Sequence, residues 1–441
     1  MTEPTNRKNF QSPRGTHDIL PDQIAAWCLI ENTFREICAR YNYGEIRTPL
    51  FEATELFART AGASSDILVT KQMYSFVAPD EQSYTLRPEG TAGAVRSYLE
   101  HHLNERGPVS KLFYIGPNFR YEAPQAGRYR QHHQCGIELL GPAEPESDAE
   151  VLALAHSFFK ELGIEAITHL NSLGTAQSRI GYIQNLKEYL EPYHEALSED
   201  SRKRLDLNPL RVFDSKDERD RSIVADAPRL LDYLRENDAE SMAHFEKLCA
   251  HLDQLGVAYK IDPGLVRGLD YYTRTAFEFV SPALGAQSIG GGGRYNGLVE
   301  ELGGASTPAI GFGIGIERLL LAREAAAAAQ APSAALTAFL VTMGDEARAA
   351  GVLVLHQLRE AGIRCDCDFV GRSIKAQMRE ANRQNARFAL VLGENELSSG
   401  TLAVKEMATS TQEVLSMAAA IAKLKLVGAD DAVARYFAHE D

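Results

Sequence analysis

Two strand patterns in the first third of the chain outline a sheet with one polar face. Residues 111–122 and 130–140 alternate as strands do, and the turn-like APQAGRY between them predicts a β-hairpin. The other face of the second strand, with Cys135, Ile137 and Leu139, can cover a core. Because side chains alternate along a strand, the first face carries Arg130, His132, Gln134, Gly136 and Glu138.

A solvated face of an antiparallel sheet is an alternative interpretation of this pattern. Such a face is usually rich in Lys, Thr and Glu, however, whereas this one has an ordered mixture that ends in a carboxylate. The facing strand adds Asn118, Arg120 and Glu122 on one face. We therefore predict that the hairpin is one wall of a binding site.

A later strand pattern has a face of bare backbone. In PAIGFGIGIERLL (308–320), glycine occupies positions 311, 313 and 315, so a flat group could lie close to the strand. Tight strand–helix packing is the alternative explanation for these small residues. Arg318, which follows at the start of a helix, and Arg120 then suggest a triphosphate site, because guanidinium binds phosphate oxygens in a planar fork.

A third glycine-rich segment is a weaker signal. The run GGGGRYNGL (290–298) lacks the GK[ST] ending of a P-loop, and we predict that it is a flexible hairpin.

The remaining patterns divide the chain into parts. Residues 22–41 have the period of an amphipathic helix, and Thr91 can cap the helix that follows the strand and turn at 83–90. An Ala-rich stretch then precedes alternating strands and helices, which predict a small α/β domain with a largely parallel sheet. We expect a core in two parts (1–178 and 256–325), a helical insertion (179–255), a linker (326–335) and the α/β domain (336–430).

Composition excludes several classes of protein. Of six scattered cysteines, only Cys365 and Cys367 are close, and neighbours two apart on a strand have poor geometry for a disulfide. No zinc or other metal site is expected, and unpaired thiols fit a reducing compartment. The uncharged stretch 325–344 is broken by Pro332 and is a poor membrane span, and the N-terminus does not resemble a secretory signal. We therefore expect a cytoplasmic protein.

The net charge of −14 argues against nucleic acid unless a local basic patch exists. One does: residues 371–388 contain five basic residues and one Glu, a net charge of +4. At steps of four, Lys375, Arg379 and Arg383 share one helix face. A solvated face is the alternative interpretation. The buried side is predicted to consist of Ile374, Met378 and Ala381.

These pieces together resemble a class II aminoacyl-tRNA synthetase. The resemblance is carried by TPLFE (48–52), FRYEAPQAGRYRQ (119–131) and GFGIGIERLL (311–320). Further segments are similar to histidyl-tRNA synthetases in particular, namely TLRPEGTAG (85–93), LVRGLDYYTRTAFEF (265–279), RGTHDILP (14–21) and NPLRVFDSK (208–216).

The resemblance implies a fold and a reaction. The fold is an α+β catalytic core, with an antiparallel sheet flanked by helices, plus a helical insertion and a C-terminal α/β anticodon-binding domain. The enzyme would use ATP, with Mg²⁺, to activate histidine and would then charge tRNA(His). It would be a homodimer with no membrane association, joined through its first motif. The alternative is a synthetase-like regulatory subunit of ATP phosphoribosyltransferase, which typically lacks the C-terminal domain.

The resemblance also assigns residues. The α-phosphate of ATP would be held by Arg120 and the γ-phosphate by Arg318, and Arg267 would lie beside the reacting carboxylate; these are the catalytic residues. The other ATP-site residues would be Arg128, His132 and Glu317. Histidine would be bound by Glu89, Thr91, Gln134, Glu138, Tyr271 and Tyr272. The tRNA would contact Gln125, Arg130, Lys375, Arg379 and Arg383.

Two positions depart from the family pattern. Position 132 is His, where the family usually has a Phe that stacks on adenine, and position 296 is Asn, where Asp is common. With several cations nearby, we expect His132 to be neutral.

Overall fold

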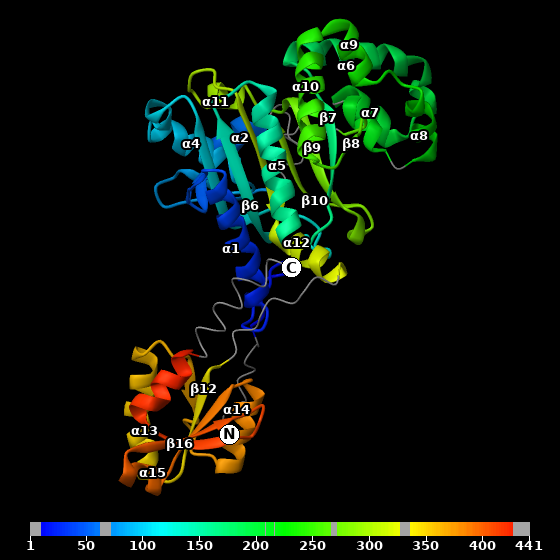
Figure 1. Ribbon diagram of the computed structural model, residues 1–441. Coiled ribbons are helices and arrows are strands. Elements are labelled where there is room, and N and C mark those ends of the chain that lie inside the picture. Colours follow the sequence, from blue (N-terminus) through cyan, green and yellow to red (C-terminus); the bar gives the residue numbers. More distant parts are fainter. Residues whose placement is uncertain are drawn as a thin grey trace, which may run out of the picture. The chain divides into compact units, whose positions relative to one another are not determined.

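The computed structural model of the 441-residue chain describes residues 10–61, 72–207, 209–215, 217–265, 271–326 and 336–426. The chain divides into two compact units, Met1–Gln330 and Ala331–Asp441, and each has its own sheet (Figure 1). Among the described helices, none combines the length and apolar character that crossing a membrane would require.

An eight-stranded mixed sheet is the centre of the first unit. Its strands, in spatial order, are β1 (Gly44–Glu45), β5 (Ser110–Phe119), β6 (Gln131–Leu140), β11 (Ala309–Gly315), β10 (Gln287–Arg294), β9 (Thr273–Ser281), β7 (Ile167–Ser172) and β8 (Tyr259–Ile261). The outer pairs β1–β5 and β7–β8 are parallel, and all pairs between them are antiparallel. The predicted hairpin is thus β5–β6, and the predicted antiparallel core sheet is confirmed.

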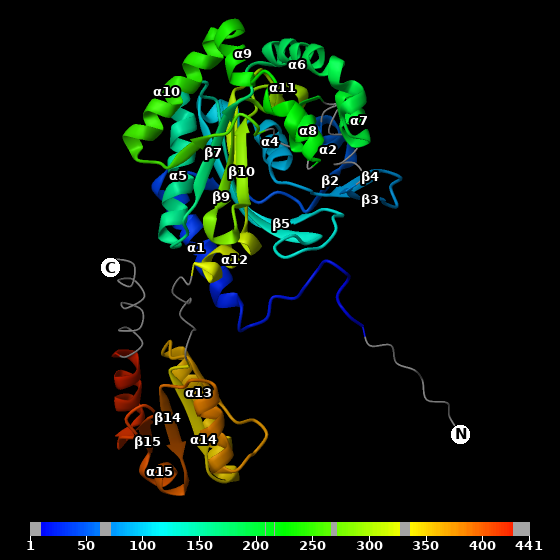
Figure 2. The same ribbon diagram turned by 90° about the vertical axis from the view of Figure 1, so that its right-hand side faces the viewer.

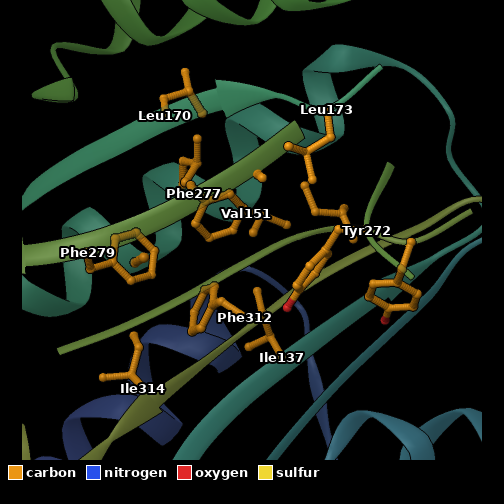
Figure 3. Packing of buried hydrophobic residues seen from close by; sticks show 14 of the residues in the cluster. Ile137, Val151, Leu170, Leu173, Tyr272, Phe277, Phe279, Phe312 and Ile314 are labelled. Atoms are coloured by element: carbon orange, nitrogen blue, oxygen red, sulfur yellow. The ribbon is translucent and has the colours of Figure 1, made fainter. Parts of the chain in front are cut away.

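One face of this sheet lies on a large apolar core. The helix α1 (Ile24–Arg40) has buried residues three or four apart, and its Phe34 ring packs edge-on against Phe312 of β11 and Phe158 of α5 (Pro145–Glu161). The strands contribute alternate residues, among them Ile137 of β6 and Ile314 of β11 (Figure 3). With this face on the core, the opposite face of β6 and β11 is left for a site.

The first unit contains further elements around the sheet. A separate three-stranded sheet consists of β2 (Phe51–Ala53), β4 (Ser83–Leu86) and β3 (Tyr74–Val77). The remaining helices near the sheet are α2 (Thr54–Ala61), α4 (Thr91–Glu100), η1 (Leu103–Arg106), η4 (Pro282–Leu284), α11 (Leu298–Glu301) and α12 (Ile316–Ala325).

A run of helices connects the neighbouring strands β7 and β8 (Figure 2). They are α6 (Ala176–Leu190), η2 (Glu191–Ala196), α7 (Glu199–Leu207), η3 (Pro209–Asp214), α8 (Glu218–Ala225), α9 (Leu230–Asn237) and α10 (Ala239–Leu255). The α10 helix packs beside α5, and Leu248 and Leu252 of α10 belong to the same apolar core as the sheet. This helical segment is therefore anchored to the sheet unit by burial of apolar area.

Two local predictions were wrong. The glycine run is not a flexible hairpin, because Gly290–Gly293 lie in β10, hydrogen-bonded to strands on both sides. Thr91 does not cap α4 either. Instead, the Glu89 carboxylate accepts the N–H groups of Thr91 and Ala92 at 2.5 and 2.9 Å, so Glu89 supplies the acceptor that the helix start needs.

The second unit is a small α/β domain with its own core. Its sheet has the order β13 (Cys365–Cys367), β12 (Ala338–Thr342), β14 (Phe388–Leu392), β15 (Thr401–Glu406) and β16 (Gln412–Ser416). β13, β12 and β14 are parallel to one another. β15 is antiparallel to β14, and β16 is antiparallel to β15. The helices are α13 (Asp345–Glu360), α14 (Ile374–Arg383) and α15 (Glu394–Ser399).

Candidate active site

The polar face of the hairpin continues into a floor of bare backbone. Across β6 and β11, Glu138 pairs with Gly311, and Gln134 pairs with Gly315. The next strand, β10, places Gly291 opposite Gly313. Because paired residues point to the same face, glycines from three neighbouring strands lie beside Gln134 and Glu138. The floor has no side chains of its own over several residues, and the side chains of Tyr114, Glu138 and Tyr272 lie over parts of it.

Glu138 lies at the closed end of this face and is fully buried. Its carboxylate accepts hydrogen bonds from Tyr114, at 2.9 Å, and from Tyr295. Burial raises the pKa of Glu138 to about 8, and nearby Glu89 adds to the rise, whereas the hydroxyls of Tyr295, Thr91 and Tyr114 act against it. The carboxyl is therefore protonated at pH 7 when no ligand is bound, and such a shifted acid is typical of functional sites.

Two of these partners, Tyr114 and Tyr295, were not predicted from sequence. Tyr114 could have been found, because it lies two positions before Gly116 and four before Asn118 on the same strand face. Its ring fills the space over Gly136, where an added Cβ would lie 2.5 Å from the phenol. Tyr295 follows the end of β10 and had no periodic signal.

A buried arginine holds Tyr295 in place from the other side. Arg294 is fully buried, and its guanidinium donates to the Asp148 carboxylate, to the Ser147 hydroxyl at 2.8 Å and to the Pro142 carbonyl at 2.9 Å. These partners lie at the start of α5 and in the segment just before it, and they hold the end of β10.

Two more residues assigned to histidine lie on the neighbouring segments. The Tyr272 ring covers Gly293 of β10, where an added Cβ would lie 2.7 Å from the ring. The Tyr271 ring lies between those of Tyr272 and Tyr295, with centroids 4.9 and 5.8 Å away. Glu138 influences the pKa of Tyr271, and burial raises that pKa well above its usual value. Tyr271 thus lies beside Glu138, and Tyr272 packs against Tyr271.

On the open side of the same face, Gln134 is held by its neighbour on β5. Its Oε1 atom accepts a hydrogen bond from Asn118 Nδ2 at 2.6 Å, and the second lone pair of this oxygen can accept another. Glu89 lies close to Glu138 and to Arg120. Burial raises its pKa, and hydrogen bonds from Ala92 and Thr91 and the charge of Arg120 act against the rise.

Three of the four arginines assigned to the ATP end of the site lie at the open end of the floor, namely Arg120, Arg318 and Arg128. Arg120 follows β5 and donates Nε–H to the Pro88 carbonyl at 2.8 Å. Arg318 in the first turn of α12 donates to the Ser288 carbonyl. Burial lowers the pKa of Arg318 and Arg128 acts in the same direction, whereas the carboxylates of Glu278 and Glu122 oppose it. The fourth predicted arginine, Arg267, lies outside the described residues.

His132 lies among these cations, on the same face as Gln134. Burial is the main cause that lowers its pKa to about 3, and the charges of Arg120 and His133 act in the same direction. The ring is neutral above pH 5, as the sequence analysis predicted.

Exchange of His132 for Phe tests whether this ring stacks on a base. We expect His132→Phe to keep activity, with a KM for ATP that is unchanged or modestly lower, because a neutral imidazole and a phenyl ring are both flat. With a pKa near 3, the KM for ATP should have the same pH profile from pH 6 to 8 in both proteins. Pyrophosphate exchange measures it, and a severe loss in the Phe variant would mean that His132 does chemistry.

Two other predicted residues are already engaged in the protein. The buried Glu317 carboxylate accepts the His133 N–H at 2.9 and 3.0 Å and contacts the His133 ring, so it supports the strand. Arg130 stacks on the Tyr121 ring at 3.9 Å and donates to the Glu122 and Arg14 carbonyls, which joins the loop to the N-terminal segment. Their proposed contacts with ATP and tRNA remain predictions, as does that of Gln125 in the turn that pairs with Arg128.

The basic stripe lies on the exposed side of α14 in the second unit. Lys375, Arg379 and Arg383 are exposed, and Arg383 forms an ion pair with Glu380. The buried side is formed by Ala381 and Gln377, whose amide bonds both the N–H and the carbonyl of Thr342. Ile374 is 41% exposed, so its predicted burial was wrong. It is the first residue of α14.

Comparisons with known proteins agree with this arrangement. The family model for histidyl-tRNA synthetase matches residues 15–319, and that for an anticodon binding domain matches residues 337–426. The chain belongs to the histidyl-tRNA synthetase family. It is 47% identical over 419 residues to a histidine–tRNA ligase of Halothermothrix orenii, which covers 95% of this chain and 99% of the relative. A Synechococcus histidine–tRNA ligase is 48% identical over 411 residues, covering 93% of this chain and 97% of the relative.

A solved structure extends the likeness to three dimensions. The apo histidyl-tRNA synthetase of S. aureus has a TM-score of 0.79 and 42% identity, covering 95% of this chain and all of that one. In this member of the histidyl-tRNA synthetase family, one face of one sheet collects the described residues assigned to histidine and to the ATP phosphates. Glu138 lies at its closed end, and Arg120 and Arg318 lie at its open end.

Proposed function

We propose that this chain is a histidine–tRNA ligase that activates histidine with ATP and then transfers it to tRNA(His). The observation that carries the proposal is the polar sheet face itself. A buried acid with three hydroxyl neighbours lies at one end, and Arg120 and Arg318 lie at the other, with glycine backbone between them. A small amino acid and a triphosphate can lie on this face in line.

The acid end suits an imidazole. The protonated Glu138 can donate to one ring nitrogen, or, after the proton moves, its carboxylate can accept from an imidazolium N–H. Both states carry the same net charge, so neither brings an extra charge into a buried site. An apolar ring of the same size could not exchange a hydrogen bond with the Glu138 carboxyl, and this missing bond at a buried polar group would penalise its binding.

The other groups around the proposed histidine are placed to hold its backbone. Glu89 and Gln134 would bind the amino group, with Thr91 nearby. The substrate carboxylate would then attack the α-phosphorus atom of the phosphate held by Arg120, with pyrophosphate leaving toward Arg318. No covalent enzyme intermediate is required. The arginines act by positioning the reactants and stabilising charge.

Mg²⁺ would accompany ATP. Among the residues that the structure describes, no group of three or more His, Cys, Asp or Glu side chains could hold a metal alone. Mg²⁺ usually keeps several waters and binds one or two carboxylates together with substrate phosphates. Glu122 and Glu278, which lie near Arg318, fit this second kind of site. The metal would neutralise charge on the leaving pyrophosphate.

The regulatory subunit of ATP phosphoribosyltransferase is the alternative within the same fold. That paralogue resembles the catalytic part and typically lacks the C-terminal domain, whereas the anticodon binding domain model matches residues 337–426 here. The proposed phosphate ligands Arg120 and Arg318 are also present, held by the Pro88 and Ser288 carbonyls. These features favour the ligase.

A homodimer is also part of the proposal. The small sheet next to the TPLFE segment exposes aromatic residues that touch one another, with ring centroids of Phe51, Phe76 and Tyr84 separated by 5.6 to 6.2 Å. Val77 is 72% exposed beside them. A contiguous apolar patch of this kind is typical of a protein interface, and the family resemblance places the dimer contact at this segment.

Aminoacylation tests the function, and truncation divides it between the two units. We expect the full chain to charge purified tRNA(His), and a fragment ending at residue 326 to keep histidine-dependent pyrophosphate exchange but to charge tRNA poorly. The reason is that the exposed basic face of α14 belongs to the second unit, which has its own core. If a folded fragment has lost exchange, then the second unit contributes to the active site. If the full chain charges no tRNA, then the proposed function is wrong.

A further inference from the structure

The backbone next to Tyr272 is strained. Arg274, two residues later, has a φ of 50°, a left-handed conformation that is strained for a non-glycine residue. Such a residue persists only where its surroundings hold it. Here the Arg274 N–H donates to the Gly174 carbonyl at 2.7 Å, and its own carbonyl accepts from the Leu173 N–H at 2.6 Å. Both partners lie between β7 and α6.

A second contact comes from the first turns of α6 itself. Arg179 donates Nη1–H to the main-chain carbonyl of Tyr272 at 2.7 Å. The ring of the same tyrosine lies over Gly293, in the apolar cluster with Leu173 and Phe312 (Figure 3). The carbonyl and the ring of Tyr272 are thus held from two directions, one from the helical segment and one from the sheet.

The helical segment is rigid at this point. Thr175 and Ser178 form a capping box at the start of α6, and the Asp238 carboxylate accepts from Ser178 Oγ at 2.5 Å. Asp238 also caps α10, through the Ser241 N–H at 3.0 Å. Burial raises the pKa of Asp238, but its hydrogen bonds with Ser178 and Ser241 outweigh this and bring it to about 2. The starts of α6 and α10 are therefore tied together.

We propose that the helical segment between β7 and β8 is a holder for the histidine-binding tyrosines and that Arg179 is a positioning residue for Tyr272. Arg179 would not touch the substrate. It would set the main chain from which the Tyr272 ring extends toward the imidazole, so its loss should weaken histidine binding and leave ATP binding alone. The inference rests on the proposed function, because it concerns the histidine end of that same site.

The test replaces Arg179 by Met, which keeps an unbranched apolar stem but is shorter and has no group that can donate. In the full-length protein, we expect the KM for histidine in pyrophosphate exchange to rise about 10-fold, as for loss of one charge-assisted hydrogen bond. The KM for ATP should change less than twofold. Histidine affinity measured by calorimetry without ATP should fall by the same factor. Arg179→Lys, which can still donate to the carbonyl, should recover part of the affinity.

The matched control is Arg235→Met on α9, where the arginine is 59% exposed and pairs with Asp232 at the surface. It should leave both KM values unchanged. A folded Arg179→Met protein with a normal KM for histidine would overturn the positioning role. Equal increases in the KM values for histidine and for ATP would also overturn it, because they point to general loosening. So would a loss of histidine affinity in Arg179→Lys as large as that in Arg179→Met. If the wild-type protein itself shows no histidine-dependent exchange, the proposed function fails instead.

Discussion

Arg318→Ala and Arg120→Ala are each expected to lower histidine-dependent pyrophosphate exchange by about 10²-fold or more. A loss of this size is typical when a preorganised charge contact to a transition state is removed. Both guanidinium groups are already held by main-chain carbonyls, those of Ser288 and Pro88. They are therefore in place before ATP arrives. Because the floor between them and Glu138 is glycine backbone, no other side chain on it can replace their charge.

Steady-state exchange with purified variants measures the effect, with circular dichroism to show that each is folded. Arg219→Ala is a suitable control, because Arg219 is 69% exposed and pairs with Asp217 at the surface. It should retain full exchange. If either site variant has nearly normal exchange, our assignment of the triphosphate site is wrong.

Glu138→Gln should raise the KM for histidine about 10- to 100-fold with little change in the KM for ATP, since an amide keeps the size but cannot share a proton with the imidazole. Glu138→Ala should be worse, because it also leaves Tyr114 and Tyr295 without their acceptor. Exchange assays at varied histidine and varied ATP separate the two effects. Equal changes in both KM values would indicate that Glu138 is a structural carboxyl. Glu199→Gln, at an exposed position, is the control.

Glu138→Gln should also make the protein more stable relative to wild type as the pH rises. Burial raises the pKa of Glu138 to about 8, far above the usual value for Glu. The folded state therefore keeps a proton that the unfolded chain loses above about pH 4.3, and the contribution of Glu138 to stability falls as pH rises toward 8. The amide does not titrate. The melting temperature of Glu138→Gln relative to wild type should thus increase from pH 5 to pH 8.5; a constant difference would contradict the raised pKa.

The sequence by itself determined which side chains share a face. A strand has a period of two whatever its neighbours are, so Gln134 and Glu138, and separately Gly311, Gly313 and Gly315, could be placed together from their spacing alone. Spacing also placed Lys375, Arg379 and Arg383 together, because residues four apart share one side of a helix, and this side of α14 is exposed. The family motifs then supplied the expected roles, because they occur along the chain in a recognisable order.

Tertiary structure decided everything that depends on which strands are neighbours. Glycine has low intrinsic strand preference, so Gly290–Gly293 read as a flexible segment, yet ladders on both sides make it a central strand. Tyr114 and Tyr295 meet at Glu138 only because β5 and the end of β10 lie near β6. Similarly, Glu317 is taken by His133 and Glu89 by the start of α4. Hydrogen bonds between residues distant in sequence leave no periodic trace, so only the folded chain shows them.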